Sequence, residues 1–537
     1  MKGYKPIYWI MLLSPSIFVV AVVVYPYFYL VRDSFNSSLV LQVFGNSITA
    51  QLTREAIGNS FYQGITSALA ALAIGLPLGL FLGSFEFRFK KLISSITIVP
   101  FFMPSIVVVF AFISGFNSNS IAAYFFPGLV DLSTGFTGIV AVNTFFNAPL
   151  VAMFAMTAVE QVDPALIQAS ETLGTGIFRR FYSIWGRSAI TAALGGALLT
   201  FAYSFSGFAA PLIIGGPKFF TMDAWIYSFV KVQGDLSAAV VMAAIEALLL
   251  FLPAVLYMLF AIRHSGATGN RTIRTAERRK LLFFTGLAYT ILWLSVEFYL
   301  FSSVILRSLS GTTNSVLVNY STLFQGSIAA RLGITTTSAI LNSLFYGMCT
   351  ALLVAALGTM WITGKRRLHS VPGNVTEIFQ YIPLVISSIL MAFSLYIVIG
   401  TSTPTTFMWV LIVMAQSSVA IPVVLRVIDA GFLTLPQSVS EASMTLKGNP
   451  FFDVELPLAG SAFASALVFG FGISLGEFSA TNFLASSSYI PITVEIYGLE
   501  NARLLGPAYA AASILMIVSV IAFYLIMKFG GRFAAVR

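Results

Sequence analysis

Long apolar stretches recur along the chain, and each has the length that a membrane-spanning helix requires. A bilayer whose hydrocarbon core is about 30 Å thick needs roughly 20 apolar residues in helical form to cross it. Stretches of this kind predict twelve spans, at residues 8–30, 60–84, 93–115, 138–159, 189–213, 236–262, 281–305, 340–363, 377–399, 406–428, 461–484 and 507–529. The pattern therefore predicts an all-α polytopic membrane protein with about twelve transmembrane helices.

Composition and charge support this class and add an orientation. Of the 537 residues, 58% are hydrophobic and 9% are charged, whereas soluble proteins carry about 25% charged residues. Cytoplasmic loops are enriched in lysine and arginine, and 22 of the 29 such residues fall in the termini and in the loops that share a side with them. We therefore expect both termini in the cytoplasm. The net charge of +9 follows from this topology, so contact with membrane lipid is expected and a nucleic-acid partner is not.

Two polar stretches interrupt the apolar pattern on the cytoplasmic side. Residues 162–181 read VDPALIQASETLGTGIFRRF, and residues 435–454 read LPQSVSEASMTLKGNPFFDV. Each combines helix-starting residues, a helical spacing of small and apolar positions, and a glycine that ends the helix. A short amphipathic helix of this kind is suited to docking in a groove of another protein. A connector that lies at the membrane interface is the alternative interpretation.

The second half of the chain repeats the first. The segment NSFYQGITSALAALAIG from Asn59 aligns with NSLFYGMCTALLVAALG from Asn342 at an offset of 283 residues, and the two polar stretches align at an offset of 273. Six spans in each copy give both copies the same orientation, so we expect two repeats, residues 1–263 and 281–537, related by an axis normal to the membrane. The basic, polar segment 264–280 is the expected cytoplasmic linker.

The polar stretches also carry a pattern known from a family of transport proteins. The pattern is E-A-A, three residues and a glycine, followed by an apolar segment that ends in Leu-Pro. Here it reads Gln168-Ala169-Ser170 with Gly174, and Glu441-Ala442-Ser443 with Leu456-Pro457. It resembles the cytoplasmic loop signature of permease subunits of binding-protein-dependent ABC importers. Two departures are Gln168 in place of the glutamate, and Lys447 at the glycine position with Gly448 after it.

The duplicated, fused form of the chain narrows this resemblance. A single twelve-span chain resembles the ferric-iron and thiamine branch of the type I importers, as do the segments FFNAPL at 145–150, GGPKFFTMDAWIY at 215–227 and SLGEF at 474–478. The resemblance covers nearly the whole chain. It implies the type I importer permease fold, a location in the plasma or inner membrane of a prokaryotic cell, and ferric iron or thiamine as the substrate.

The resemblance further implies partners and coupling residues. The loops 162–187 and 435–458 would each dock a helix on a separate ATPase subunit, expected to be a homodimer, and an extracellular or periplasmic solute-binding protein would deliver the substrate. ATP and magnesium would bind to the ATPase, so this chain is expected to be a translocating subunit with no cofactor and no enzyme activity. The expected ATPase-coupling residues are Gln168, Ala169, Glu171, Gly174, Glu441, Ala442, Ser443 and Gly448.

Nucleotide and metal motifs are not expected on this chain. A phosphate-binding loop requires G-x-x-x-x-G-K-[ST], and the nearest approach, GTMWITGKR at 358–366, has five spacers and ends on arginine. We interpret it as the end of a span with its basic anchor. Cys349 is the single cysteine and both histidines lie in loops, so no Cys/His metal site is expected. The energy for transport must come from another subunit or from an ion gradient.

Polar residues inside the predicted spans are candidates for the translocation path. Asn143 and Gln416 occupy equivalent places in the fourth and tenth spans, and Glu477 follows a glycine-rich part of the eleventh. Ionisable groups are costly in the bilayer, so they normally face a cavity or a partner. For the amides, the alternative is hydrogen bonding between helices. For Glu477, it is pairing with backbone or hydroxyl groups at a helix break. Two further acids, Glu246 and Glu297, lie in the sixth and seventh spans.

One other intramembrane pattern predicts packing instead of function. Gly75, Gly79 and Gly83 recur every four residues on the second span, which places them on one face of a helix. Small residues let helices approach closely in a membrane, so we expect this stripe to lie against another helix.

Two other function classes compete with the importer interpretation. In a secondary transporter of a small cation, the intramembrane acids would carry coupling protons, and uptake would follow an ion gradient without an ATPase. That class leaves the two repeated cytoplasmic helices unexplained. A membrane-embedded enzyme should show histidine, aspartate or cysteine clustered at one depth, and the sequence does not show this.

Overall fold

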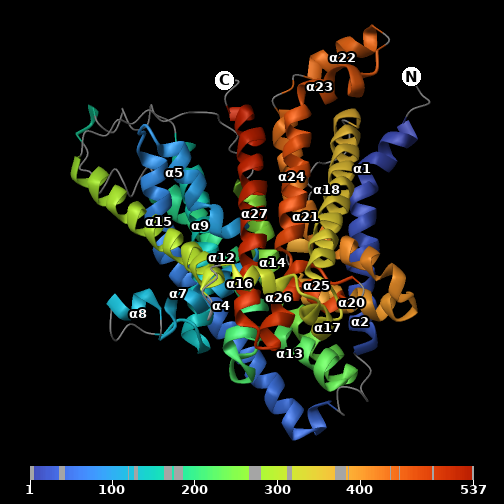
Figure 1. Cartoon of the computed structure of the whole chain (residues 1–537). Helices are drawn as coiled ribbons and strands as arrows, with labels where there is room; N and C mark the ends of the chain where they lie inside the picture. Colours follow the sequence, from blue (N-terminus) through green and yellow to red (C-terminus); the bar gives the residue numbers. More distant parts are fainter. Residues whose placement is uncertain are drawn as a thin grey trace. The chain divides into compact units, whose positions relative to one another are not determined.

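The structure is a computed structural model, and it describes residues 5–34, 43–118, 120–125, 131–162, 172–174, 186–264, 280–310, 317–368, 382–384, 386–433, 435, 437–446, 448–486 and 489–534. Every regular element in these residues is a helix, as the apolar pattern predicts (Figure 1). The chain divides into two compact units. Unit 1 comprises Met1–Asn46, Ile226–Ala247 and Ser308–Arg537, and unit 2 comprises Ser47–Trp225 and Leu248–Arg307.

The main helices of each unit have the following bounds. Unit 2 contains α4 (Ser47–Ser84), α5 (Lys90–Thr97), α6 (Val99–Phe102), α7 (Ser105–Phe116), α8 (Ile121–Phe125), α9 (Gly135–Glu160), α12 (Arg187–Phe205) and nearly all of α15 (Lys280–Leu309). Unit 1 contains α1 (Lys5–Val19), α2 (Tyr25–Ser34), α16 (Val318–Leu323), α17 (Gly326–Leu332), α18 (Thr336–Arg367), α20 (Ser388–Val398), α21 (Met408–Leu433), α22 (Gln437–Thr445), α23 (Leu456–Leu458), α24 (Gly460–Gly476), α25 (Ser479–Leu484), α26 (Ile492–Asn501) and α27 (Leu505–Ala534). Both α13 (Met222–Ser228) and α14 (Leu236–His264) contribute to the two units.

The number of helices that can cross a membrane is close to the predicted twelve. Among the described residues, ten helices are long and apolar enough, and an eleventh results if the bent pair Phe451–Leu458 and Ala462–Gly476 is one span. In the remaining predicted span, 377–399, the described residues form the three-residue helix Ile382–Leu384 and α20. The 11 residues of α20 are fewer than the roughly 20 that a crossing needs. Residues 377–381 and 385 of that span lie outside the described residues.

The predicted glycine stripe lies in the packing centre of unit 2. A Cβ added to Gly75 would lie 2.4 Å from the carbonyl oxygen of Ala148, and one added to Gly79 would lie 2.3 Å from that of Ala152, both on α9. Gly83 likewise faces Val159 at the end of α9. The backbones of α4 and α9 are therefore in direct contact, which confirms the packing interpretation of the stripe.

Unit 1 builds its centre from the repeated counterparts of the same helices. In unit 1, α18 packs against α21 and α24, as α4 packs against α9 and α12 in unit 2. Gly358 of α18 lies against Ile428 of α21, and Gly470 of α24 lies against Val354 of α18. The repeat seen in the sequence is thus a repeat of packing.

The compact units do not coincide with the sequence repeats, because the first span of each repeat, and also Ile226–Ala247 of the first repeat, belong to the unit built mainly from the other repeat. The long helix α1 belongs to unit 1, where its Leu12 lies against Gly364 of α18. The helix α15 packs in unit 2 against α4, where Gly286 lies against the Phe81 ring and the Tyr289 hydroxyl donates to the Ile74 carbonyl at 3.2 Å. The repeat boundaries at 263 and 281 remain a prediction from the sequence.

The repeated Asn-Ser pair at the start of the sequence alignment makes equivalent hydrogen bonds in both units. Asn59 Nδ2 donates to the Phe220 carbonyl at 3.1 Å, and the Met222 amide donates to Ser60 Oγ at 3.1 Å. In unit 1, Asn342 Nδ2 donates to the Ile490 carbonyl at 3.1 Å, and the Ile492 amide donates to Ser343 Oγ at 2.8 Å. Each pair holds the start of a short helix, α13 or α26, against a long span.

Two spans of each repeat are interrupted at equivalent positions. In the third span, α6 and α7 are separated at Met103 and Pro104, and the counterpart α20 begins at Ser388, 283 residues after the start of α7. In the fifth span, α12 ends at Phe205 and its counterpart α24 ends at Gly476. Proline cannot donate a backbone hydrogen bond, which accounts for the break before α7. Broken helices in a membrane require polar partners for the freed backbone groups.

Candidate functional site

The second predicted cytoplasmic helix is present as α22. It extends beyond the ends of α18, α21 and α24, at the end of unit 1 where α1 begins and α27 ends (Figure 1). Its Ser440 and Ser443 are buried, at 1% and 8% exposure. The opposite face is open, because Val439 is 41% and Leu446 at its end is 83% exposed. Glu441 and Ala442 are also exposed, so the outer surface of α22 combines apolar and small side chains with one carboxylate.

Helical spacing in the sequence places Val439, Ala442, Ser443 and Leu446 on one face of this helix, and the structure exposes three of these four residues. Val439, Ala442 and Leu446 are exposed as the docking interpretation requires, whereas Ser443 faces inward. Residues at i and i+3 share a helix face, so Ser440 and Ser443 together form the inner side of α22. Ser440 Oγ donates to Glu455 Oε1 at 3.0 Å, and this bond fixes the inner side to the returning chain.

Gly448 closes the helix by close packing. Its amide donates to the Ser443 carbonyl at 2.9 Å. A Cβ at Gly448 would lie 2.7 Å from Asp453 Oδ2 and 2.8 Å from Ser443 Oγ. A larger residue at this turn would therefore require the Asp453 and Ser443 side chains to move.

The first predicted cytoplasmic helix lies mostly outside the described residues. This applies to Gln168, Ala169 and Glu171. Gly174 is described, and its φ of +61° lies in the left-handed region that glycine adopts at helix ends. The preceding Leu173 is 79% exposed. The coupling role of these residues remains a prediction.

Inside the membrane part of unit 1, Gln416 is the centre of a hydrogen-bond network. Its Oε1 accepts from Ser474 Oγ at 2.6 Å and from Thr350 Oγ1 at 3.2 Å, and its Nε2 donates to Thr481 Oγ1 at 3.1 Å. These partners lie on α24, α18 and α25. Gln416 therefore makes the interhelical hydrogen bonds that the packing alternative describes.

Glu477 occupies the break between α24 and α25. Its Oε1 accepts from the Ala480 amide at 2.9 Å, and its Oε2 accepts from the Thr481 amide at 2.9 Å and from Thr481 Oγ1 at 2.7 Å. The carboxylate thus satisfies backbone donors that the broken helix leaves open. Through Thr481 it joins the Gln416 network, so the structure brings two of the three predicted path residues together. Their role in a path remains a prediction.

The equivalent positions of unit 2 are polar but lack this network. Asn143 donates no bond from its buried Nδ2 to any described residue, and the hydroxyls of Ser67 and Ser204 are likewise buried without partners there. In the repeat alignment, Ser67 corresponds to Thr350 at the offset of 283. After the polar stretch the second copy is about three residues shorter, so that SFSGF at 204–208 aligns with SLGEF at 474–478 and Gly207 corresponds to Glu477. The first repeat therefore keeps the polar positions and lacks the carboxylate that organises them in the second. Its Asn143 carbonyl accepts from Asn147 Nδ2 at 2.8 Å.

The acids of the sixth and seventh spans are buried. Glu246 of α14 is 0% exposed and Glu297 of α15 is 3% exposed. Sequence reasoning found these two, but it missed Glu455 and Glu495, which are also buried, at 0% and 1% exposure. No local pattern marks either one, because their partners lie far away in the sequence.

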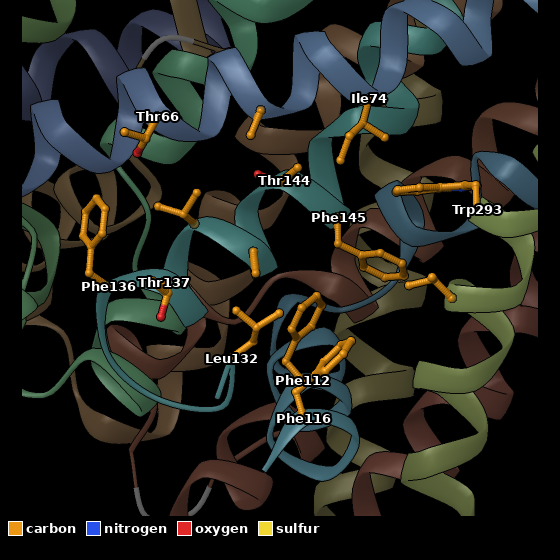
Figure 2. Close-up of a pocket in the computed structure, with 14 residues that line it drawn as sticks. Thr66, Ile74, Phe112, Phe116, Leu132, Phe136, Thr137, Thr144, Phe145 and Trp293 are labelled. Carbon is orange, nitrogen blue, oxygen red and sulfur yellow. The ribbon is translucent and has the colours of Figure 1, made fainter. Parts of the chain in front are cut away.

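Unit 2 also contains an apolar cavity of about 630 Å³ between α4, α7, α9 and α15 (Figure 2). Aromatic side chains dominate its wall, including Phe112, Phe116, Phe145 and Trp293. Thr144 and Trp293 each place a buried polar atom, without a described partner, in this wall. No charged residue lines the cavity, so it offers no ligands for a bare metal ion. Elsewhere, too, the described residues contain no group of three histidine, cysteine or acidic side chains that could hold a metal.

Comparison with known proteins shows which transport proteins this chain resembles. Residues 75–265 match the family described as binding-protein-dependent transport system inner membrane component. The matched region contains the glycine stripe, α9, the first polar stretch, α12 and α14.

Full-length relatives extend the likeness over both repeats. The chain is 26% identical to the ferric transport system permease protein of Actinobacillus pleuropneumoniae over 528 residues, covering 90% of this chain and 72% of the relative. It is 22% identical to the thiamine transport system permease protein of Haemophilus influenzae over 475 residues, covering 86% of each. A molybdate/tungstate permease protein of Pyrococcus abyssi is 31% identical over 163 residues, 30% of this chain and 61% of the relative.

Proposed function

We propose that this chain couples solute import to a separate ATPase. Part of the chain matches the binding-protein-dependent transport system inner membrane component family, and most of its length resembles ferric and thiamine permeases. It is a multi-pass importer permease. In the proposed coupling, ATP and magnesium bind to the ATPase partner, and this chain forms the translocation path for the solute.

The observation that carries the proposal is the arrangement of α22. Its inner serines bind the body of unit 1, whereas Val439, Ala442 and Leu446 are exposed at the end of the unit. An exposed apolar helix face on an anchored helix is suited to a groove in a partner protein. We assign this face, with Glu441, to one ATPase subunit of a homodimer, and the stretch around Gly174 to the other.

The orientation follows from the same assignment. An ATPase acts in the cytoplasm, so α22, the start of α1 and the end of α27 lie on the cytoplasmic side of a prokaryotic plasma or inner membrane. The opposite face of the permease would receive substrate from an extracellular or periplasmic binding protein. The interrupted third and fifth spans, with Asn143, Gln416 and Glu477, are the proposed lining of the path, since broken helices in corresponding positions mark substrate sites in many transporters.

The substrate is proposed to be ferric iron or thiamine, the solutes named for the two relatives that match most of this chain. The test is to purify the chain with its co-expressed ATPase in proteoliposomes and to measure ATP hydrolysis with ferric-loaded and thiamine-loaded binding proteins. Stimulation by one loaded protein identifies the substrate and supports coupling. If no ATPase copurifies and uptake depends on a proton gradient alone, the chain is a secondary transporter. In that case the buried Glu246 and Glu297 would be the candidate carriers of the coupling protons.

A further inference from the structure

Three consecutive basic residues at the end of α18 hold the chain that leads into α22. Lys365 Nζ lies 3.2 Å from Asp429 Oδ1 on α21. Arg366 Nη1 donates to the Phe432 carbonyl at 2.9 Å, and Arg366 Nη2 donates to the Leu435 carbonyl at 3.2 Å. The last turn of α21 and the residues before α22 are thus bound to α18.

The same helix end also holds α22 itself and the chain that leaves it. Arg367 Nη2 donates to Glu455 Oε1 at 3.0 Å, and Arg366 Nε lies 3.7 Å from the same oxygen. Ser440 of α22 donates to this oxygen as well, at 3.0 Å. Glu455 ends the segment Phe451–Glu455, through which the chain returns to the membrane. One carboxylate oxygen therefore joins α18, α22 and the returning chain.

The burial of this ion cluster makes it a rigid joint. The Glu455 side chain is 0% exposed, and those of Arg367 and Arg366 are 9% and 13% exposed. Separating buried opposite charges leaves each without solvation, so such a pair resists opening far more than an exposed pair does. The Lys365–Asp429 pair, with both side chains 29% exposed, is more accessible to solvent and therefore resists separation less than the buried Glu455 pairs. A displacement of α22 would act on the end of α18 through the Ser440 hydrogen bond and this ion cluster.

We propose that the Arg366–Arg367–Glu455 cluster, with Ser440, is the joint that transmits movement of α22 to α18, so that these are positioning residues for energy coupling. The inference rests on the proposed function, because the ATPase is the source of the movement. It separates two tasks: the outer face of α22 binds the partner, and the inner cluster passes the displacement to a membrane span that reaches Thr336 at its other end.

The first repeat lacks this joint among its described residues. Gly83 and Ser84 occupy the positions of Arg366 and Arg367 in the repeat alignment. Nearby, Lys90 bridges Glu86 at 2.9 Å and Glu160, the last residue of α9, at 3.0 Å. This bridge fixes the end of the span that precedes the first polar stretch. The proposal therefore expects the two cytoplasmic loops to contribute unequally.

The single cysteine of the chain provides a native reporter for the test. Cys349 lies on α18 with intermediate exposure, 18 residues before Arg367 and hence roughly 27 Å from it along the helix. In the purified permease–ATPase complex, we expect the rate of Cys349 alkylation by N-ethylmaleimide to change at least threefold between the nucleotide-free and vanadate-trapped states. In Glu455→Gln, this change should disappear while the ATPase still copurifies in the wild-type ratio.

Two further variants separate coupling from folding. Ser440→Ala removes only the hydroxyl link and should fold normally, and we expect it to reduce the nucleotide-dependent change about twofold. Asp429→Asn breaks the exposed pair at the same helix end and should leave the change intact. The proposal is overturned if Cys349 shows no nucleotide dependence in the wild type, or if Ser440→Ala and Glu455→Gln both retain the full change. Failure of the ATPase to bind the wild-type chain would instead contradict the proposed function.

Discussion

Replacing Gly79 by alanine tests whether the contact between α4 and α9 is as close as the structure shows. The added Cβ would lie 2.3 Å from the Ala152 carbonyl oxygen and 2.6 Å from the Ala155 Cβ. Even a favourable carbon–oxygen contact needs about 3.3 Å or more. Both obstructing groups belong to the body of α9 and cannot rotate away, so the two helices must separate by roughly 1 Å at this point.

The magnitude follows from two opposing effects. Alanine is favoured over glycine inside a helix by about 1 kcal/mol. Overpacking a close contact costs about 1–3 kcal/mol, and a gap of up to 1 Å also forfeits roughly a quarter to a half of the dispersion energy along the separated surfaces. We expect a net destabilisation of about 2 kcal/mol. For a chain of 537 residues that unfolds as one unit, that corresponds to a fall in Tm of roughly 2 °C.

Gly58 on the same helix provides the matched control, because a Cβ there would have nothing within 4 Å. Thermal unfolding of both variants in the same detergent should show the midpoint of Gly79→Ala about 2 °C below that of the wild type, and the midpoint of Gly58→Ala equal to it or above. Equal midpoints for the two variants would refute the backbone contact, and with it the packing interpretation of the glycine stripe.

Three other predictions follow from single contacts. Burial raises the pKa of Glu495, on the short helix α26 outside the membrane spans, from 4.5 to about 7. Between these pH values the folded state holds a proton that the unfolded state has lost, so the free energy of unfolding should fall by up to about 3 kcal/mol as pH rises from about 4.5 to 7. Tm measured across this pH range should lose this slope in Glu495→Gln. Ser343→Ala and Ser60→Ala should speed hydrogen exchange at the Ile492 and Met222 amides respectively, each variant at its own amide only, because those amides donate to the two hydroxyls. Gly364→Leu should lower Tm because a Cβ there meets the Leu12 backbone at 2.5 Å, and a variant as stable as the wild type would contradict the α1–α18 contact.

The sequence predicted the features that depend on periodicity. Hydropathy located ten or eleven of the twelve predicted spans among the described residues. Helical spacing placed Gly75, Gly79 and Gly83 on one face, which the structure puts against α9. The repeat alignment singled out Asn59 and Asn342, and the two amides make the same bond in both units. These predictions succeed because a helix converts regular spacing into a common face.

Contacts between distant segments could not be predicted in the same way. The segment ending in Lys365, Arg366 and Arg367 has the appearance of a basic anchor at a span end, yet Arg367 pairs with a carboxylate 88 residues away. Hydropathy gives the depth of a charge in the membrane and carries no information about its partner. For the same reason, the sequence could not decide between a path and a structural role for Glu477, whose three donors lie within four residues but only because the helix breaks there.

The two repeats differ in the side-chain sizes at the contacts that their first spans, α1 and α15, make. Phe81 on α4 and Gly364 on α18 occupy equivalent positions at the offset of 283, but one is large and the other has no side chain. Their partners have the opposite sizes, since Phe81 lies against Gly286 of α15 and Gly364 against Leu12 of α1. If α1 packed on α4 instead, Leu12 would lie against the large Phe81 side chain and the contact would be overpacked. If α15 packed on α18, Gly286 would face Gly364 and leave a cavity. The complementary sizes therefore assign each first span to one compact unit, although the repeated spans themselves are alike.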